Sequence, residues 1–326
     1  MPSGYSRRDF IATLGAVAAS SCLPAVAGLP AIFGSERLYP PMNLSHFDRP
    51  ITPAAADIRF GYASITWNGQ DRQAIEDIAS LGFPGIQLRS NVFGEFTDDP
   101  IGTIKGLLAE NKLQMVAFSS GALDVEKPEE AQYQDHLYHT NFVREVGGLY
   151  LQVTSARPKD RAVTPGDYAH LGRMLTELGK RTADEGISLG FHNHMNSLGQ
   201  GPDEVDKIFD AVDPRYAKLE LDIAHYYQGG GDPVKAVNDY RDRLLFLHLK
   251  DVIELPGGER GGDKYKWVEL GRGLVDVVGV VAALQKSNFR GWAIIELDSV
   301  PDPGDTPKEC AAINKKFVEE KLGYTI

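Results

Sequence analysis

Short apolar runs alternate with amphipathic segments from Ile58 to the end of the chain. Eight of these runs have the length and β-branched or aromatic content of buried strands, and most begin roughly 30 residues after the one before, a usual βα-unit length. The predicted strands are Ile58–Trp67, Gly85–Ser90, Met115–Gly121, Leu149–Ala156, Ile187–His194, Ala217–His225, Leu244–Asp251 and Trp292–Asp298.

The intervening segments carry helix start and stop signals. Thr164-Pro165 and Asp232-Pro233 each place a capping residue before a first-turn proline, and Gly186 ends the helix that Thr164 begins. The other predicted helices are Gln70–Leu81, Pro100–Asn111, Glu130–Val146, Pro202–Val212, Val275–Gln285 and Pro307–Lys321. Eight strands alternating with helices predict an α/β fold, a (β/α)8 TIM barrel in a single domain spanning residues 58–326. A doubly wound open sheet is the alternative, but no G-x-G-x-x-G loop follows the first strand.

The first 57 residues do not fit this alternation. Ser6-Arg7-Arg8-Asp9-Phe10-Ile11 resembles a twin-arginine export signal, and Ala25-Val26-Ala27 fits a small-residue cleavage site. The apolar run 10–19 between them is too short to span a bilayer. We therefore expect a signal peptide over 1–27, a linker or N-terminal arm over 28–57, and a periplasmic or secreted protein. A disordered cationic tail and a lipid anchor at Cys22 are the alternatives.

Composition narrows the function classes. The chain has 326 residues and a formal net charge of −11, which opposes binding to nucleic acid because a phosphate backbone attracts clustered Lys and Arg. The same charge opposes an anionic membrane surface. Two cysteines, Cys22 and Cys310, are too few for a disulfide framework or a zinc–cysteine cluster. A small-molecule ligand remains the expected partner, and the sequence leaves open whether the chain forms a homo-oligomer.

Metal-ligand residue types end the last four predicted strands. They are His192 and His194, then Asp222 and His225, then His248, then Glu296. All strands of a parallel barrel end at the same rim, so we expect these side chains to converge. A mixed set of imidazoles and carboxylates suits a divalent metal such as Mn, Co, Fe or Zn. The alternative is a polar network that is purely structural, since a single His at a strand end is usually a hydrogen-bonding core or loop residue.

These motifs resemble the xylose isomerase-like TIM barrels, the sugar phosphate isomerase/epimerase group that includes D-tagatose 3-epimerase and inosose dehydratase. The resemblance covers roughly residues 58–323. The matching segments are GFHNH at 190–194, LDIAH at 221–225, LHLKD at 247–251, LGRGLVD at 270–276 and GWAIIELD at 291–298.

The resemblance implies one divalent metal ion (Mn, Co, Mg or Zn) held by Glu, Asp, His and Glu from the last four strands. Asp222, His248 and Glu296 match three of these positions, and His192 stands where the family has its first glutamate. In the epimerases of the family the two glutamates act as the acid/base pair. Here an imidazole replaces one of them, which casts doubt on simple two-carboxylate epimerisation.

The activity that this implies is a metal-dependent isomerase or epimerase acting on a sugar, keto-sugar or cyclic polyol, by proton abstraction next to a carbonyl. His194 or Glu296 would move the proton, and Lys250 would hold Glu296 or contact the substrate. The predicted substrate-binding residues are His225, Trp67, Asn68 and Arg260, although Trp67 could equally pack in the core. The alternatives are a dehydratase or lyase acting on a keto-sugar or inositol derivative, a non-catalytic sugar-binding barrel, and a DNA-repair endonuclease, which the acidic charge opposes.

A long polar, glycine-rich gap separates the seventh and eighth predicted strands. It contains residues 254–262, Lys264–Trp267 and the segment 270–273. Loops after barrel strands form the active-site face, so this segment is either a lid or substrate loop or a tolerated surface insertion.

Overall fold

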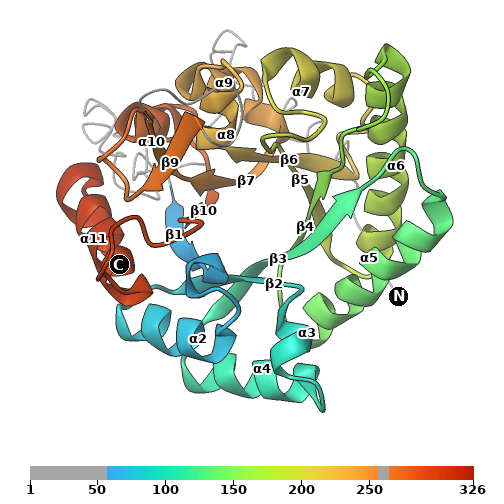
Figure 1. The fold of residues 1–326 in the computed structure, drawn as a ribbon. Coiled ribbons are helices and arrows are strands. Elements are labelled where there is room, and N and C mark those ends of the chain that lie inside the picture. The colour runs from blue at the N-terminus through green and yellow to red at the C-terminus, as the bar shows by residue number, and fades with distance from the viewer. Residues whose placement is uncertain (1–56, 256–263) are drawn as a thin grey trace, which may run out of the picture. The chain divides into compact units, whose positions relative to one another are not determined.

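The computed structural model describes residues 57–255 and 264–326. The predicted export signal, nearly all of the predicted arm and Arg260 lie outside these residues. Within them, eight parallel strands close into a barrel in the order β1-β10-β7-β6-β5-β4-β3-β2 (Figure 1). The strands are β1 (Ile58–Ala63), β2 (Gly85–Arg89), β3 (Gln114–Leu123), β4 (Tyr150–Ser155), β5 (Ser188–His192), β6 (Ala217–Asp222), β7 (Leu244–Leu249) and β10 (Gly291–Ile295). The predicted (β/α)8 barrel is confirmed.

Helices surround the barrel in Figure 1. They are α2 (Asp71–Ser80), α3 (Val92–Glu95), α4 (Pro100–Glu110), α5 (Glu129–Glu145), α6 (Pro165–Asp184), α7 (Pro202–Phe209), α8 (Ile223–Gln228), α9 (Pro233–Asp239), α10 (Val277–Lys286) and α11 (Pro307–Phe317), which continues as a π-helical turn over Val318–Leu322. Thr164 begins α6 and Thr306 begins α11, each with a capping box. Every helix predicted from the sequence is present, while the short helices α3 and α8 were not predicted.

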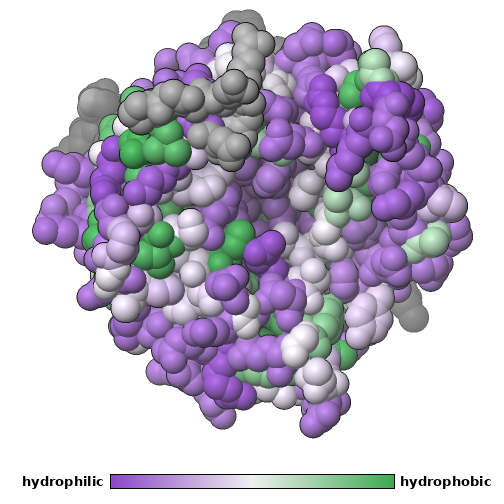
Figure 2. Space-filling view, viewed as in Figure 1, coloured by the Kyte–Doolittle hydropathy of each residue, from purple (hydrophilic) through white to green (hydrophobic). Residues whose placement is uncertain are grey.

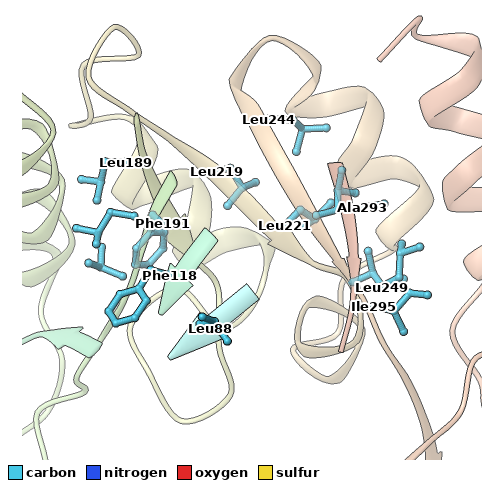
Figure 3. Close-up of a cluster of buried hydrophobic side chains, with 14 of the residues drawn as sticks. Leu88, Phe118, Leu189, Phe191, Leu219, Leu221, Leu244, Leu249, Ala293 and Ile295 are labelled. Carbon is cyan, nitrogen blue, oxygen red and sulfur yellow. The ribbon is translucent and has the colours of Figure 1, made fainter. Parts of the chain in front are cut away.

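The core has two layers that follow the period-2 alternation of the strands. Side chains on the outward faces of the strands pack beneath the helices; Figure 3 shows Leu88, Phe118, Phe191, Leu221 and Leu249 among them. The inward faces fill the barrel with a second apolar cluster, composed of Ala63, Val116, Ala117, Phe246, Trp292 and Ile294. Polar residues replace this cluster toward the carboxyl ends of β5, β6 and β7, which creates room for chemistry at that rim.

Several predicted strands end earlier than expected: β10 stops at Ile295 rather than Asp298, β5 at His192 rather than His194 and β7 at Leu249 rather than Asp251. Two others, β6 and β1, end early because helical turns begin there. β6 ends at Asp222 instead of His225, because Asp222 Oδ1 accepts hydrogen bonds from the backbone N–H groups of Ala224 (2.9 Å) and His225 (2.8 Å) and thereby begins α8. β1 ends at Ala63, and residues Ser64–Trp67 form the 3-10 helix η3. The prediction that these strands continue to His225 and Trp67 was wrong for that reason.

The gap between the seventh and eighth barrel strands contains a second small sheet. β8 (Asp251–Glu254) pairs antiparallel with β9 (Tyr265–Val268), with Val252 opposite Trp267. This element was not predicted from the sequence. Among the described residues, none of the helices combines the length and the apolar character that a membrane span requires.

Candidate metal centre

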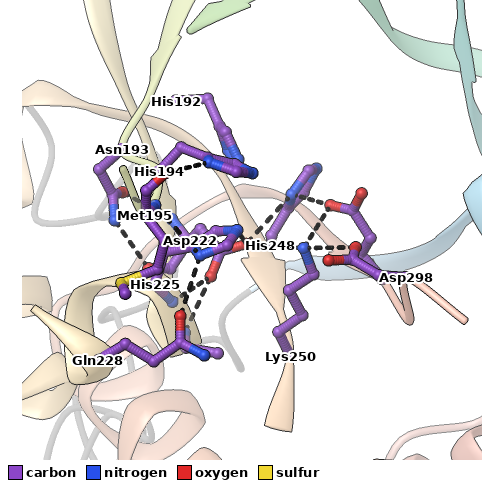
Figure 4. Close-up of polar contacts among 12 residues, drawn as sticks. His192, Asn193, His194, Met195, Asp222, His225, Gln228, His248, Lys250 and Asp298 are labelled. Carbon is purple, nitrogen blue, oxygen red and sulfur yellow. Dashed lines mark hydrogen bonds and ion pairs between the residues drawn. The ribbon is translucent and has the colours of Figure 1, made fainter. Parts of the chain in front are cut away.

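A buried polar cluster occupies the rim of the barrel formed by β5, β6, β7 and β10. Figure 4 shows His192, His194, Asp222, His248 and Lys250 directed toward one another from these strands and the loops that follow them. In the space-filling view of this end of the barrel, hydrophilic residues line the hollow at the middle of the face (Figure 2). The side chain of Asn193 ties the end of β5 to β6, since Asn193 Nδ2 donates to the carbonyl of Asp222 (3.0 Å) and Asn193 Oδ1 accepts from the Asp222 N–H (2.9 Å).

Three predicted ligands meet in the cluster. One ligand atom each from Asp222, His248 and Glu296 lies within 4.8 Å of the others. His248 Nδ1 is 3.6 Å from Asp222 Oδ2 and makes an ion-pair contact with Glu296 Oε2, yet none of these three buried atoms makes a hydrogen bond of normal geometry. Buried polar atoms without partners are costly, and a divalent cation would satisfy all three at once. These side chains therefore fit the predicted metal ion.

The ring of His248 faces acceptors on its other side. Its Nε2 lies 2.6 Å from Glu220 Oε1 and 2.8 Å from Gln87 Oε1. Because both neighbours accept, Nε2 carries a proton, and Nδ1 is the nitrogen that faces Asp222 and Glu296. Burial acts to lower the pKa of His248, but the carboxylates of Glu220 and Glu296 outweigh it and hold that pKa well above its usual value.

His192, the fourth predicted ligand, sits beside this trio rather than within it. Its Nδ1 is 3.3 Å from Glu220 Oε1, and its ring is 4.9 Å from the ring of His248. One nitrogen of His192 also lies within 4.8 Å of nitrogens of His194 and His225. Its role as a metal ligand stays a prediction.

His194 has the geometry of a base. Its Nδ1 lies 2.7 Å from the carbonyl oxygen of Met195, which can only accept, so Nδ1 carries the proton and Nε2 keeps a lone pair. Burial, together with the nearby His192 and Lys250, lowers the pKa of His194 to about 4. The imidazole of His194 is therefore neutral at neutral pH.

His225 packs against His194 in the first turn of α8. The two ring centroids are 3.9 Å apart, and His225 Nε2 is 4.0 Å from Asp222 Oδ2 without a hydrogen-bond partner among the described residues. Burial holds the pKa of His225 well below its usual value. The predicted substrate-binding residue is thus part of the buried cluster.

Lys250 neutralises the carboxylates of the cluster. Its Nζ lies 2.8 Å from Asp298 Oδ1 and 3.5 Å from both Asp222 Oδ2 and Glu296 Oε2. The predicted link between Lys250 and Glu296 is present. The sequence interpretation missed the aromatic partner of Lys250, which is Trp267 on β9. The ammonium lies 4.6 Å from the centre of the Trp267 ring, and that ring also meets His225 edge-on at 5.1 Å.

Trp67 and Asn68, two of the other predicted substrate-binding residues, lie outside the cluster. Trp67 is 3% exposed in the hydrophobic core, where its Nε1 donates to Asp77 Oδ2 (2.9 Å), so it has no free face for a sugar. Asn68 lines a separate cavity of ≈200 Å³ at the ends of β1 and β2, and Arg260 lies outside the described residues. A larger cavity of ≈470 Å³ is formed by residues that follow His194 and His225 in the chain together with two from the β9 side; its lining is Met195, Asn196, Gln200, Gln228, Gly229, Gly230, Lys264 and Tyr265.

The chain belongs to the xylose isomerase-like TIM barrel family, since the model of that family matches residues 75–316. An inosose dehydratase of Clostridium beijerinckii is 24% identical over 298 residues, covering 82% of this chain and 98% of the relative. The IOLI protein with a bound zinc atom superposes with a TM-score of 0.68 at 15% identity, covering 80% of this chain and 97% of that one. The probable 3-DHS dehydratase AsbF of Bacillus anthracis superposes with a TM-score of 0.66 at 14% identity, covering 81% and 99%.

Proposed function

We propose that the protein is a divalent-metal-dependent enzyme that removes a proton next to the carbonyl of a keto-sugar or cyclic keto-polyol. The observation that carries this proposal is the meeting of Asp222 Oδ2, His248 Nδ1 and Glu296 Oε2, all buried and without hydrogen bonds, beside the neutral imidazole of His194. A structural polar network would pair its own atoms in hydrogen bonds, whereas these three atoms make none of normal geometry, and a cation between them would satisfy all three.

Asp222, His248 and Glu296 would hold the metal ion, with His192 as the predicted fourth ligand. When bound, the metal would polarise the substrate carbonyl and stabilise the negative charge that develops on its oxygen. Imidazole together with carboxylate suits Mn, Co or Zn better than Mg. The zinc atom in the similarly folded IOLI protein agrees with this choice.

His194 is the residue that we assign to the proton. Its Nδ1 is held by the Met195 carbonyl, which leaves Nε2, for which no partner is found among the described residues, to take a proton from carbon; the imidazolium so formed can return it. Glu296 is the second predicted acid/base group; its contact with His248 favours a role at the metal. Lys250 pairs with the carboxylates of Glu296 and Asp298, while its ammonium group packs against the face of the Trp267 ring.

Dehydration is the outcome that the relatives' names favour. After His194 takes the proton, the electron pair of the C–H bond forms a carbon–carbon double bond, and the hydroxyl on the next carbon leaves and is protonated to water. An isomerase or epimerase would use the same first step and return the proton to carbon instead. A non-catalytic sugar-binding barrel would perform neither step.

The test combines metal analysis with solvent exchange. Purified protein should contain about one divalent metal ion per chain, and loaded protein should convert an inosose in D₂O to an unsaturated ketone that absorbs in the ultraviolet. Deuterium incorporation without the unsaturated product would identify an isomerase or epimerase. Neither exchange nor product in the metal-loaded protein, across keto-sugars and inososes, would contradict catalysis and favour the sugar-binding alternative.

We further propose that the protein is exported, because the Arg7-Arg8 segment and the small residues at 25–27 fit a cleaved signal. A chain with both arginines replaced by lysine should stay in the cytoplasm uncleaved, whereas the unchanged chain should lose about 27 residues. Equal location and mass of the two proteins would refute this proposal.

A further inference from the structure

We propose that Glu220 is a positioning residue of the metal centre: one buried carboxylate orients both His192 and His248, so that each ring turns its other nitrogen toward the site. This inference rests on the proposed function, since it concerns the same metal ion. Glu220 was not among the residues predicted from the sequence to act at the site.

Glu220 lies inside the barrel on β6, two residues before Asp222, and is fully buried. Its Oε1 is 2.6 Å from His248 Nε2 and 3.3 Å from His192 Nδ1. The register between β5 and β6 places His192 directly opposite Glu220, and the register between β6 and β7 places His248 opposite Asp222. One carboxylate oxygen thus reaches two imidazoles from neighbouring strands on either side.

This arrangement selects one nitrogen on each ring. A carboxylate accepts only, so His248 Nε2 and His192 Nδ1 each carry a proton toward Glu220. The nitrogens that face away from Glu220 are then His248 Nδ1 and His192 Nε2. His248 Nδ1 is the atom that already faces Asp222 and Glu296. A carboxylate behind a ligand histidine fixes the ring and raises its basicity as a ligand.

A polar layer behind Glu220 supports this role. Gln87 Nε2 donates to Gln152 Oε1 (3.3 Å), which leaves Gln87 Oε1 as a second acceptor 2.8 Å from His248 Nε2. Gln87, Gln152 and Glu220 come from β2, β4 and β6, and all three are buried. They cross the barrel interior, where apolar side chains such as Phe246 and Ile294 fill the neighbouring positions.

The energetic cost of Glu220 indicates a role beyond packing. Neither of its carboxylate oxygens makes a hydrogen bond of normal geometry with any described residue, although His192 and His248 keep the pKa of Glu220 below its usual value despite burial. A buried charge whose pairing is incomplete is costly, whereas an apolar side chain of similar volume would carry no such cost. The orientation of the His192 and His248 rings accounts for a carboxylate buried at this depth.

The experiment compares Mn²⁺ affinity in the unchanged protein, in Glu220→Gln and in the matched control Glu269→Gln. Glu269 is also fully buried, but it bonds Arg272 outside the cluster. We expect Glu220→Gln to bind one Mn²⁺ with about 10- to 100-fold weaker affinity and to shift the visible absorption of the Co²⁺-loaded protein, while Glu269→Gln changes neither. A purely structural role would lower the melting temperature of both variants without changing metal affinity.

Other outcomes overturn the inference in distinguishable ways. Unchanged Mn²⁺ affinity in Glu220→Gln refutes positioning, and loss of the metal as complete as in Asp222→Asn would make Glu220 a direct ligand instead. Absence of metal from the unchanged protein refutes the proposed function itself. Should Glu220→Gln fail to fold, Gln87→Met removes the second acceptor of His248 Nε2 and should weaken Mn²⁺ binding by a smaller factor, whereas equal binding again refutes positioning.

Discussion

Two histidine clusters lie in the described part of the barrel, and they differ in whether their polar atoms are paired. The outer cluster lies between β3 and α5, where Ser120 Oγ is 2.6 Å from His136 Nδ1 and 2.7 Å from His139 Nδ1. One imidazole accepts the hydroxyl proton of Ser120 and the other donates to its oxygen. None of these three side chains, all within the described residues, has a buried nitrogen or oxygen without a partner.

The inner cluster, at the rim of β5, β6, β7 and β10, contains more polar groups and satisfies fewer of them. His192 Nδ1, Asp222 Oδ2, His225 Nε2, His248 Nδ1 and Glu296 Oε2 are all buried and without hydrogen bonds. The outer cluster is neutral, since burial lowers the pKa of both His136 and His139, whereas the inner one gathers carboxylates around Lys250 and His248. A polar cluster that pairs its own atoms holds a helix to a strand, while one that leaves atoms unpaired at a barrel rim is prepared for a ligand.

The largest expected effect separates the two clusters by metal content. His248→Ala removes the central ligand, so the purified protein should lose its metal, and with it all activity. His139→Ala, in the outer cluster, should keep about one metal ion per chain. Elemental analysis of both variants decides; full metal retention in His248→Ala would refute the ligand set.

Loss of the base should spare the metal but slow the reaction. His194→Gln removes the free Nε2 lone pair, and we expect kcat to fall by about 10²- to 10⁴-fold, the range for a general acid/base group. Metal content should not change, because His194 is not among the three convergent ligands. His170→Gln serves as the control, since His170 only bonds Glu129 at the surface. If kcat of His194→Gln stayed within about threefold of the unchanged protein, a residue other than His194 would be the base.

Removal of the shared hydroxyl should damage the outer cluster in stability alone. Ser120→Ala leaves the Nδ1 atoms of His136 and His139 buried without a partner, which costs about 1 to 3 kcal/mol of unfolding free energy. Urea unfolding measures this, and metal affinity and kcat should not change. Ser80→Ala, an exposed serine that bonds only the Asp77 carbonyl, should cost less than about 0.5 kcal/mol. Altered metal affinity in Ser120→Ala would mean that the two clusters are coupled.

The outer cluster should also lose stability in acid. Burial and the neighbouring His139 lower the folded-state pKa of His136 to about 4, below its ordinary value of 6.5. Between these two values the unfolded chain binds a proton at His136 and the folded protein does not. The contribution of His136 to the unfolding free energy is therefore complete above pH 6.5 and is lost as the pH falls toward 4. The slope reaches at most about 1.4 kcal/mol per pH unit. His136→Gln should flatten the measured curve between these values, and an identical slope in both proteins would contradict the assignment.

The fold was predictable because every βα unit carries local signals. The predicted strand Gly85–Ser90 and the observed β2 (Gly85–Arg89) differ by one residue, and the helix that Thr164 begins was predicted from its cap and its terminal glycine. Asp222, His248 and Glu296 were predictable as a group, since alternate residues of parallel strands share a face and all strands end at one rim.

Contacts that depend on register and on unpredicted elements were not accessible from the sequence. Glu220 shares a face with Asp222, but only the offset between β5, β6 and β7 brings it against two imidazoles. For the same reason Trp67 was predicted as the aromatic residue of the site and the contact of Trp267 with Lys250 was not foreseen. Trp67 follows a strand that ends early and folds into the core, while Trp267 reaches Lys250 because β9 pairs with β8.

The smallest expected effects compare these two tryptophans. Trp267→Phe weakens the cation–π contact with Lys250 by about 0.5 to 1 kcal/mol, so kcat/KM should fall about two- to fivefold with metal content and melting temperature unchanged. Trp67→Phe removes the hydrogen bond to Asp77 from the core, and should lower the unfolding free energy by about 1 kcal/mol without changing kcat/KM. Steady-state kinetics gives kcat/KM for each variant, and urea unfolding gives the unfolding free energy of each. If instead only Trp67→Phe altered kcat/KM, Trp67 would be the tryptophan that acts at the site. Trp267 would then only pack on the β8–β9 hairpin.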